Sequence, residues 1–335
     1  MPEVSIVMSS YNHELYIADT IESFLNQSFS DLELIIVDDA STDGSADIIR
    51  SYQRQDNRIH AVFRELNQGS TKTFNEAMGL CKGNYIGTCS SDDLWFNNAI
   101  EILLERCREY PNHVVMGNGI SIDANGHELG CLHVEFEDTP SERTSGDIFE
   151  ELLYRQGPYF FIQTMLVEHK FIADLRMDES YQWMYEYVYF LELARRCPFH
   201  FTDDMIFMHR IHGDNQTFKV ISGGPNEERA RVARYYLREC PSRLHQKVQL
   251  QLCRTILLDA IKKQNFDEAR YVFCFMMSID ASLADMIQNS FLMGLEPEAI
   301  TFSLEVLGCK ITFSMAWIGL TLQDAKSVVP VFSPD

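Results

Sequence analysis

The sequence predicts an α/β protein with a mostly parallel central sheet, followed by an α-helical region. The first observation is a set of short apolar runs, typical of buried strands, at 4–8, 32–37, 59–63 and 85–89. The second is that segments with helical spacing of apolar residues separate these runs, at 14–27, in a stretch that ends near Tyr52, and at 70–81. Because this strand–helix–strand order requires right-handed crossovers, we expect the four strands to be parallel.

A mixed segment follows the fourth strand. After a helix at 96–110, Asn125-Gly126 is typical of a hairpin turn between two strands, at 113–123 and 127–133. Beyond the hairpin, the pattern predicts a helix at 145–155, a strand at 160–167, a helix at 181–196 and an extended segment at 199–208.

A change of composition at Ser222-Gly223-Gly224-Pro225 separates this part from a region of helical periodicity with few strand formers. Helices are expected there at 227–238, 242–264, 267–277 and 281–294. We therefore predict two domains, 1–222 and 223–335. The last residues, which include Pro330 and Pro334, are expected to form a loose tail.

The composition excludes several classes of protein. With 335 residues, of which 46% are hydrophobic and 23% charged, the chain can bury a sizeable core. Its net charge of −21 argues against binding nucleic acid or an anionic membrane through bulk charge. The nine cysteines are irregularly spaced without a CxxC pair, which indicates reduced thiols rather than a zinc module. We find no leader pattern and no apolar run of about 18 residues, so we expect a cytoplasmic protein and leave open a contact with the inner face of a membrane.

Polar clusters follow three of the predicted strands, at 9–12, 38–39 and 90–93. Since parallel strands end at the same edge of a sheet, we expect these clusters to converge on one cleft. Adjacent carboxylates such as Asp92 and Asp93 are costly to bury unless a cation or hydrogen-bond donors meet them. We therefore interpret them as holding a divalent metal on a nucleoside diphosphate, and the alternative is a solvated turn at a helix N-terminus. The absence of GxGxxG after the first strand disfavours a dinucleotide site.

Several motifs occur in a defined order, at 4–12, 36–45, 67–69, 83–86 leading to Asp92-Asp93, 178–194 and 210–215. Together they resemble glycosyltransferase family 2, whose members have the GT-A fold. The resemblance covers residues 2–217 and implies that the first domain is a GT-A catalytic domain, whereas the helical region after residue 225 carries no resemblance.

The resemblance implies roles for residues around the nucleotide and the metal. Ser9 and Tyr11 would line the nucleotide pocket, and Asp39 would accept a hydrogen bond from the uracil ring of a UDP-sugar, with Asp38 as the alternative ligand and Asp39 then a cap. Ser90 occupies the usual first aspartate of the DxD motif. Coordination of Mn²⁺ or Mg²⁺ would then rely on Asp93 and Asp92, since these cations take hard oxygen ligands.

The later motifs contain the remaining candidates. Glu186 matches the position of the general base, because Tyr185-Glu186 stands where the family has a Glu-Asp pair. The alternative is that Glu186 is an ordinary exposed helix residue. Arg210 would pair with a phosphate and His212 would be a metal or phosphate ligand. Two further residues could reach the diphosphate or the sugar, namely Asn67 and Lys72.

These observations predict an inverting, metal-dependent glycosyltransferase that moves a sugar from a nucleoside diphosphate sugar, such as a UDP-sugar, to a hydroxyl of a saccharide or lipid-linked saccharide. Two alternatives stay open. A sugar-nucleotide nucleotidyltransferase would release pyrophosphate instead of UDP, and a degenerate GT-A module would bind UDP without turnover. The helical region could cover the acceptor site, form a homo-oligomer or dock on a membrane, and the sequence does not choose among these roles.

Overall fold

A computed structural model of the chain describes residues 1–132, 145–158, 160–213, 226–240, 244–280, 301–306 and 309–314. The chain divides into two compact units, one made of Met1–Phe149 and Gly157–Ser222, the other of Glu150–Gln156 and Gly223–Asp335. The segment Glu150–Gln156 therefore groups with the later helices. The predicted boundary between domains 1–222 and 223–335 remains a proposal.

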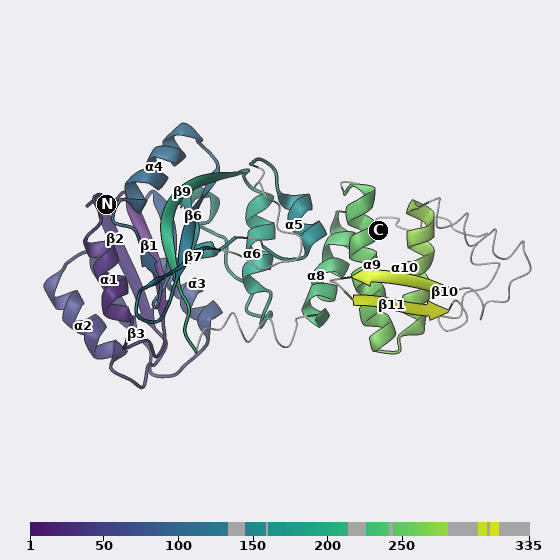
Figure 1. Ribbon diagram of the computed structural model, residues 1–335, viewed down its shortest axis with the longest axis horizontal. Helices are drawn as coiled ribbons and strands as arrows, with labels where there is room; N and C mark the ends of the chain where they lie inside the picture. Colours follow the sequence, from purple (N-terminus) through teal and green to yellow (C-terminus); the bar gives the residue numbers. More distant parts are fainter. Residues whose placement is uncertain are drawn as a thin grey trace, which may run out of the picture. The chain divides into compact units, whose positions relative to one another are not determined.

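The first unit is built on a sheet (Figure 1). The first half of this sheet is parallel, as the sequence predicts. Its strands lie in the order β3, β2, β1, β4, and each pairs in parallel with its neighbours. They span Ile59–Phe63, Leu32–Asp38, Val4–Ser10 and Tyr85–Ser90, respectively. In this register Ser9 lies beside Ser90, and Ser10 lies beside Asp38. The three strands that precede the polar clusters thus end side by side.

Helices cover both faces of this sheet because alternate strand residues point to opposite faces. Val4, Ile6 and Met8 belong to a buried cluster with residues of α1, α2 and α4. These three helices span Ile17–Leu25, Ser45–Gln55 and Ala99–Glu109. The helix α3 (Ser70–Leu80) packs on β1 and β2 through its own buried residues. The strands are therefore buried on both sides, which explains why they read as continuous apolar runs.

The second half of the sheet is mixed. Strand β8 (Met165–Glu168) runs antiparallel to both β4 and β6 (Val114–Ile122). Strand β9 (Phe199–Arg210) pairs in parallel with β6, and β5 (Leu94–Trp95) runs antiparallel to β9. The predicted hairpin turn is confirmed, since Gly126 has a φ of 86° between β6 and β7 (Glu128–Cys131). The pairing of Leu94 with Met208 brings the end of β9 to the segment that follows β4.

The strand predicted at 160–167 is only partly correct. Ile162–Thr164 forms a 3₁₀ turn, η1, and the strand β8 begins at Met165. Side chains take up the carbonyl groups of this turn, since Thr88 Oγ1 donates to Ile162 O at 2.7 Å and Trp95 Nε1 donates to Gln163 O at 3.0 Å. These bonds replace the ladder that a strand would make. A second short turn, η2 (His169–Phe171), and the helix α6 (Tyr185–Ala194) follow.

The second unit contains the helices predicted at 227–238, 242–264 and 267–277, as well as a hairpin that was not predicted from the sequence. Its helices are α5 (Phe149–Arg155), α8 (Asn226–Glu239), α9 (Gln246–Lys262) and α10 (Phe266–Ile279). Arg234 of α8 joins the other two long helices, because its guanidinium bonds Asp259 at 2.7 Å and Glu268 at 2.7 Å. The antiparallel strands β10 (Thr301–Val306) and β11 (Cys309–Ser314) form the hairpin.

The hairpin has a signal in the sequence, since polar and apolar residues alternate along β10 with a period of two. The helix predicted at 281–294 and the predicted tail lie outside the described residues. Among the described helices, none combines the length and the apolar character needed to cross a membrane.

Candidate functional site

The site lies at the edge of the sheet where β1, β2 and β4 end. The turn after β1 is tied to the loop after β2, because Asn12 N donates to Ser41 Oγ at 3.0 Å and Asn12 Oδ1 accepts from Thr42 N at 2.8 Å. Asn12 has a φ of 55°, a left-handed conformation that asparagine adopts more readily than most residues. The two loops therefore form one framework around the segment 90–93, as the sequence predicts from the strand ends.

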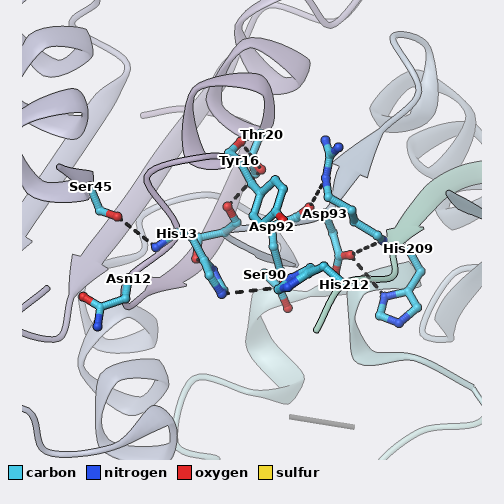
Figure 2. Close-up of polar contacts among 12 residues, drawn as sticks. Asn12, His13, Tyr16, Thr20, Ser45, Ser90, Asp92, Asp93, His209 and His212 are labelled. Carbon is cyan, nitrogen blue, oxygen red and sulfur yellow. Dashed lines mark hydrogen bonds and ion pairs between the residues drawn. The ribbon is translucent and has the colours of Figure 1, made fainter. Parts of the chain in front are cut away.

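Asp92 is enclosed by two histidines (Figure 2). It is 7% exposed, and its Oδ2 lies 3.0 Å from His212 Nε2 and 3.8 Å from His13 Nε2. One potential ligand atom from each of these three residues lies within 4.8 Å of the others. Burial by itself raises the pKa of Asp92, but the hydrogen bond from His212 and the charges of the two histidines outweigh it and lower that pKa.

Asp93 has different partners from its neighbour. It is 2% exposed, and its Oδ1 accepts hydrogen bonds from the backbone of Arg210 at 2.8 Å and from His209 Nδ1 at 3.1 Å. Burial, together with the charge of Asp92, raises the pKa of Asp93. Asp93 is predicted as a metal ligand together with Asp92, but the structure groups His13, not Asp93, with Asp92 and His212. A metal-ligand role for Asp93 remains a prediction.

His13 is not among the site residues predicted from the sequence. A signal was available, because His13 directly follows the first strand-end cluster, 9–12, which we expected to line the cleft. The backbone of His13 is held by the loop after β2, since His13 N donates to Ser45 Oγ at 2.9 Å.

Arg210 joins β9 to this site through buried contacts. Its side chain is 3% exposed; its Nε donates to the backbone oxygen of Asp92 at 2.9 Å, and its Nη2 lies 3.3 Å from Asp19 Oδ2. Its guanidinium also lies over the ring of Tyr16, 5.0 Å from the ring centre. These contacts hold the end of β9 against the segment after β4. A phosphate would have to share this guanidinium, and the predicted phosphate contact stays a prediction.

The two aspartates after β2 also differ. Asp38 bonds its own loop, because its carboxylate accepts from Ser41 N at 3.0 Å and from Ser41 Oγ at 2.6 Å. Asp39 instead accepts from the backbones of Gln68 at 2.9 Å and Gly69 at 2.8 Å. Arg64 Nη1 adds a third contact to Asp39 at 3.1 Å. Asp39 thus anchors the loop that begins α3, in which Gly69 has a φ of 91°.

The other predicted nucleotide-binding residues surround this loop and the end of β1. Asn67 Oδ1 accepts from Gly69 N at 3.2 Å, so it also shapes the loop. Ser9 is partly buried near the end of β1, and Tyr11 is 43% exposed. Lys72 is at the surface, with its Nζ 4.0 Å from Glu179 Oε2. The roles proposed for these residues toward a nucleotide remain predictions.

Glu186 lies in the first turn of α6. Among the described residues, no side chain or backbone group forms a hydrogen bond or ion pair with its carboxyl group. Burial alone raises the pKa of Glu186 to about 7. The adjacent Tyr187 and Tyr189 are buried, so these two aromatic residues form part of the core. Such a carboxyl group can exchange a proton near neutral pH.

The first turn of α6 is tied to the loop that Asp39 anchors. The hydroxyl of Tyr185 lies 3.5 Å from Ser70 Oγ, at the start of α3. One turn further along α3, Asn75 Oδ1 accepts from Met177 N at 2.8 Å, and Asn75 Nδ2 donates to Met177 O at 2.9 Å. The helix α3 therefore contacts both the loop that Asp39 anchors and the first turn of α6. These contacts place the first turn of α6, which contains Glu186, beside the start of α3.

Comparison with known proteins identifies the family. The family model described as "Glycosyl transferase family 2" matches residues 5–169. An uncharacterized glycosyltransferase of Haemophilus influenzae is 34% identical over 197 residues, which cover 58% of this chain and 73% of that protein. The putative teichuronic acid biosynthesis glycosyltransferase TuaG of Bacillus subtilis is 44% identical over 104 residues, which cover 31% of this chain and 41% of TuaG.

The fold is also that of a solved structure. The crystal structure of S. aureus TarS 1–349 in complex with UDP-GlcNAc aligns with a TM-score of 0.59 at 15% identity, covering 92% of this chain and 96% of TarS 1–349. The predicted GT-A fold is thereby confirmed. The family match and the Haemophilus relative show that this chain belongs to glycosyltransferase family 2.

Proposed function

We propose that the chain is an inverting, metal-dependent glycosyltransferase that transfers a sugar from a nucleoside diphosphate sugar to a hydroxyl of a saccharide or lipid-linked saccharide during polysaccharide synthesis. The observation that carries the proposal is that two carboxyl groups have different surroundings. Asp92 is grouped with two potential metal ligands, whereas Glu186 is partly buried and has no bonding partner among the described residues. Asp92 can bind a metal that offsets charge on the departing diphosphate, and Glu186 can accept the proton of the acceptor hydroxyl.

A UDP-sugar is the proposed donor. TarS, which has the same fold, has been crystallised with UDP-GlcNAc and with UDP. In this chain Asp39 would accept a hydrogen bond from the uracil ring while its other contacts hold the loop of Gln68 and Gly69. Asp39 would thus bind the uracil ring and the loop before α3 at the same time, which links binding of the uracil to the position of α3.

Asp92 and His212 would hold the divalent metal. The donor set fits the cation, because a carboxylate oxygen and an imidazole nitrogen suit Mn²⁺, and diphosphate oxygens and waters can fill the remaining positions. When bound, Mn²⁺ or Mg²⁺ offsets negative charge on the diphosphate. Asp92 also satisfies a physical requirement of such a site. Among the described residues its carboxylate has no lysine or arginine partner in an ion pair.

Glu186 would act as the general base. It removes the proton of the acceptor hydroxyl as that oxygen bonds to the anomeric carbon, while the bond from the anomeric carbon to the diphosphate oxygen breaks. A single displacement of this kind inverts the anomeric configuration and needs no enzyme nucleophile. A pKa of about 7 suits the role, since a base is most effective when its pKa is close to the working pH.

The test combines a binding screen with product analysis. Thermal shift with Mn²⁺ and a panel of nucleoside diphosphate sugars should identify one donor that raises the melting temperature, because a ligand specific for the native state stabilises it. That donor is then incubated with a panel of saccharide and lipid-linked acceptors. Release of the nucleoside diphosphate, with an inverted linkage in the product, is the expected result.

Pyrophosphate release would point to a nucleotidyltransferase and would overturn the proposal. Binding of UDP without transfer across the whole panel would instead indicate a degenerate module. His60→Gln serves as a matched control, because His60 also faces a buried carboxylate, Glu33, at 3.6 Å, but on β3 and β2 away from the strand-end site. This variant should retain full transfer.

A further inference from the structure

We propose that His13 is a third protein ligand of the metal, so that the site is a two-histidine, one-carboxylate centre formed by His13, Asp92 and His212. The inference rests on the proposed metal dependence and adds a residue and a metal preference to it. A ligand from the turn after β1 would also fix that turn directly to the cation. Within the described part of the chain, this is the one group of three such side chains close enough to share an ion.

The distances fit a common ion. Neighbouring ligands of a six-coordinate divalent cation lie roughly 3 Å apart when each is about 2.1 Å from the metal. His212 Nε2 is 3.0 Å from Asp92 Oδ2, and His13 Nε2 is 3.8 Å from the same oxygen. His13 thus needs only a small movement to take an adjacent position. The two imidazole rings are nearly perpendicular, at 88°, with their centres 5.8 Å apart.

His13 is already held in the orientation that a ligand requires. Its Nδ1 lies 2.7 Å from Ser91 Oγ, which leaves Nε2 directed toward Asp92. Metal-binding histidines commonly use their second ring nitrogen in this way, because the outer hydrogen bond fixes the tautomer and the ring plane. Ser91 is 1% exposed, so its hydroxyl is a fixed partner rather than a surface group. The imidazole of His13 is itself 22% exposed, which leaves a path for the ion.

The neighbouring pair of His209 and Asp93 lacks these features. The same oxygen of Asp93 that faces His209 also accepts the backbone N–H of Arg210, and no third potential metal ligand is grouped with them within the described residues. That pair is accounted for by hydrogen bonding between β9 and the segment after β4. The group around Asp92 instead directs two imidazole nitrogens at one carboxylate oxygen, which is an arrangement that a cation would complete.

The proposed ligand set has a consequence for metal choice. Imidazole nitrogen favours transition metals, whereas Mg²⁺ prefers oxygen ligands and keeps its waters. Two histidines should therefore make the site prefer Mn²⁺ or Co²⁺ to Mg²⁺ more strongly than one histidine does. Removal of His13 should weaken this preference as well as the affinity.

The direct test counts the nitrogens on the metal. Electron spin-echo envelope modulation of Mn²⁺ bound to the full-length protein with UDP should show two histidine nitrogens. His13→Asn and His212→Asn should each show one. The His13→Asn change is informative because the asparagine amide can keep the contact with Ser91 near the position of Nδ1 but cannot reach the position of Nε2.

Affinity provides a second readout. Titration with Mn²⁺ in the presence of UDP should give a dissociation constant at least about tenfold higher for His13→Asn, comparable to or larger than the effect of losing an outer hydrogen bond. His13→Gln, which places an amide oxygen near the position of Nε2, should recover part of that loss. Ser91→Ala should weaken binding while leaving two nitrogens on the metal, and the control His60→Gln should change neither readout.

The outcomes separate this inference from the proposed function. One nitrogen in the unmodified protein that persists in His13→Asn would overturn the role of His13 and leave metal dependence intact. Failure of the unmodified protein to bind Mn²⁺ with UDP would overturn both. If His13→Asn lost its circular dichroism signal, His13→Gln would decide, since its spectrum should then show one nitrogen with the fold preserved.

Discussion

The carboxyl groups of Asp92 and Glu186 lie in opposite environments. At the strand ends, hydrogen bonds and neighbouring histidines lower the pKa of Asp92, so it stays ionised. In the first turn of α6, burial raises the pKa of Glu186 to about 7, and no group in the described part of the chain bonds its carboxyl. Pairs of carboxyl groups whose surroundings separate their pKa values in this way are typical of sites that need one permanent charge and one proton acceptor. The difference assigns metal binding to one side and proton transfer to the other.

The largest effect is expected on the strand-end side. Asp92→Asn should lower the transfer rate about a thousandfold or more, because the amide binds a divalent cation poorly and charge on the diphosphate is then not offset. Steady-state rates with Mn²⁺, with matching circular dichroism spectra to show an intact fold, provide the measurement. Undiminished turnover of this variant in the presence of EDTA would show that the reaction does not depend on a metal.

Glu186→Gln should have the next largest effect, and a different one. We expect kcat to fall by about 10² to 10⁴, the usual contribution of a general base. Affinity for UDP and Mn²⁺ should be unchanged, since Glu186 does not belong to the group around Asp92. Measuring kcat together with calorimetric binding of UDP separates the two sides. Equal losses of both quantities would show that the division between them is wrong.

Asp39→Asn should affect the donor more moderately. The substitution keeps the shape of the side chain but removes the charge opposite Arg64. The amide NH₂ would replace one carboxylate oxygen and would face the N–H of either Gln68 or Gly69. We expect the KM for the donor to rise by about tenfold, in line with about 1–2 kcal/mol for an impaired buried hydrogen bond. The acceptor KM is the internal control. A change in the acceptor KM alone would show that Asp39 does not act in donor binding.

The smallest expected effect concerns stability. The pKa of Glu186 is about 7 in the folded protein and about 4.3 in the unfolded chain. Its contribution to stability is therefore fully present below about pH 4.3 and is lost as the pH rises to about 7. Glutamine never ionises, so Glu186→Gln should melt several degrees higher than the unmodified protein at pH 8 and at nearly the same temperature at pH 4. A gain that is equal at both pH values would contradict the environment assigned to Glu186.

The sheet and the convergence of its strand ends were predictable because both follow from periodicity and chain order. Apolar runs separated by amphipathic helices fix a parallel sheet, and that sheet brings Asp39 and Asp92 to one edge whatever the details of the loops. Periodicity and chain order did not place His212. Only the resemblance to the family predicted that it lies near Asp92. The structure supplies the reason, which is the pairing of β9 with β5 and β6.

The partners of individual side chains were not predictable in this way. Asp92 and Asp93 are adjacent, and the turn after β4 decides which one faces the histidines at 13 and 212 and which one bonds the backbone of Arg210. The isolation of Glu186 likewise depends on packing across elements distant in the sequence. The 3₁₀ turn at Ile162–Thr164 was missed because side-chain donors from β4 and β5, rather than local pattern, satisfy its carbonyl groups.

The dependence of kcat/KM on pH tests the central claim most directly. Measured for the unmodified protein between pH 5 and 9 at saturating Mn²⁺, kcat/KM should rise about tenfold per pH unit at low pH and level off above about pH 7, as Glu186 loses its proton. In Glu186→Gln the residual activity should lack this inflection. The same inflection in that variant would show that another group accepts the proton, and Glu186 would lose its assigned role.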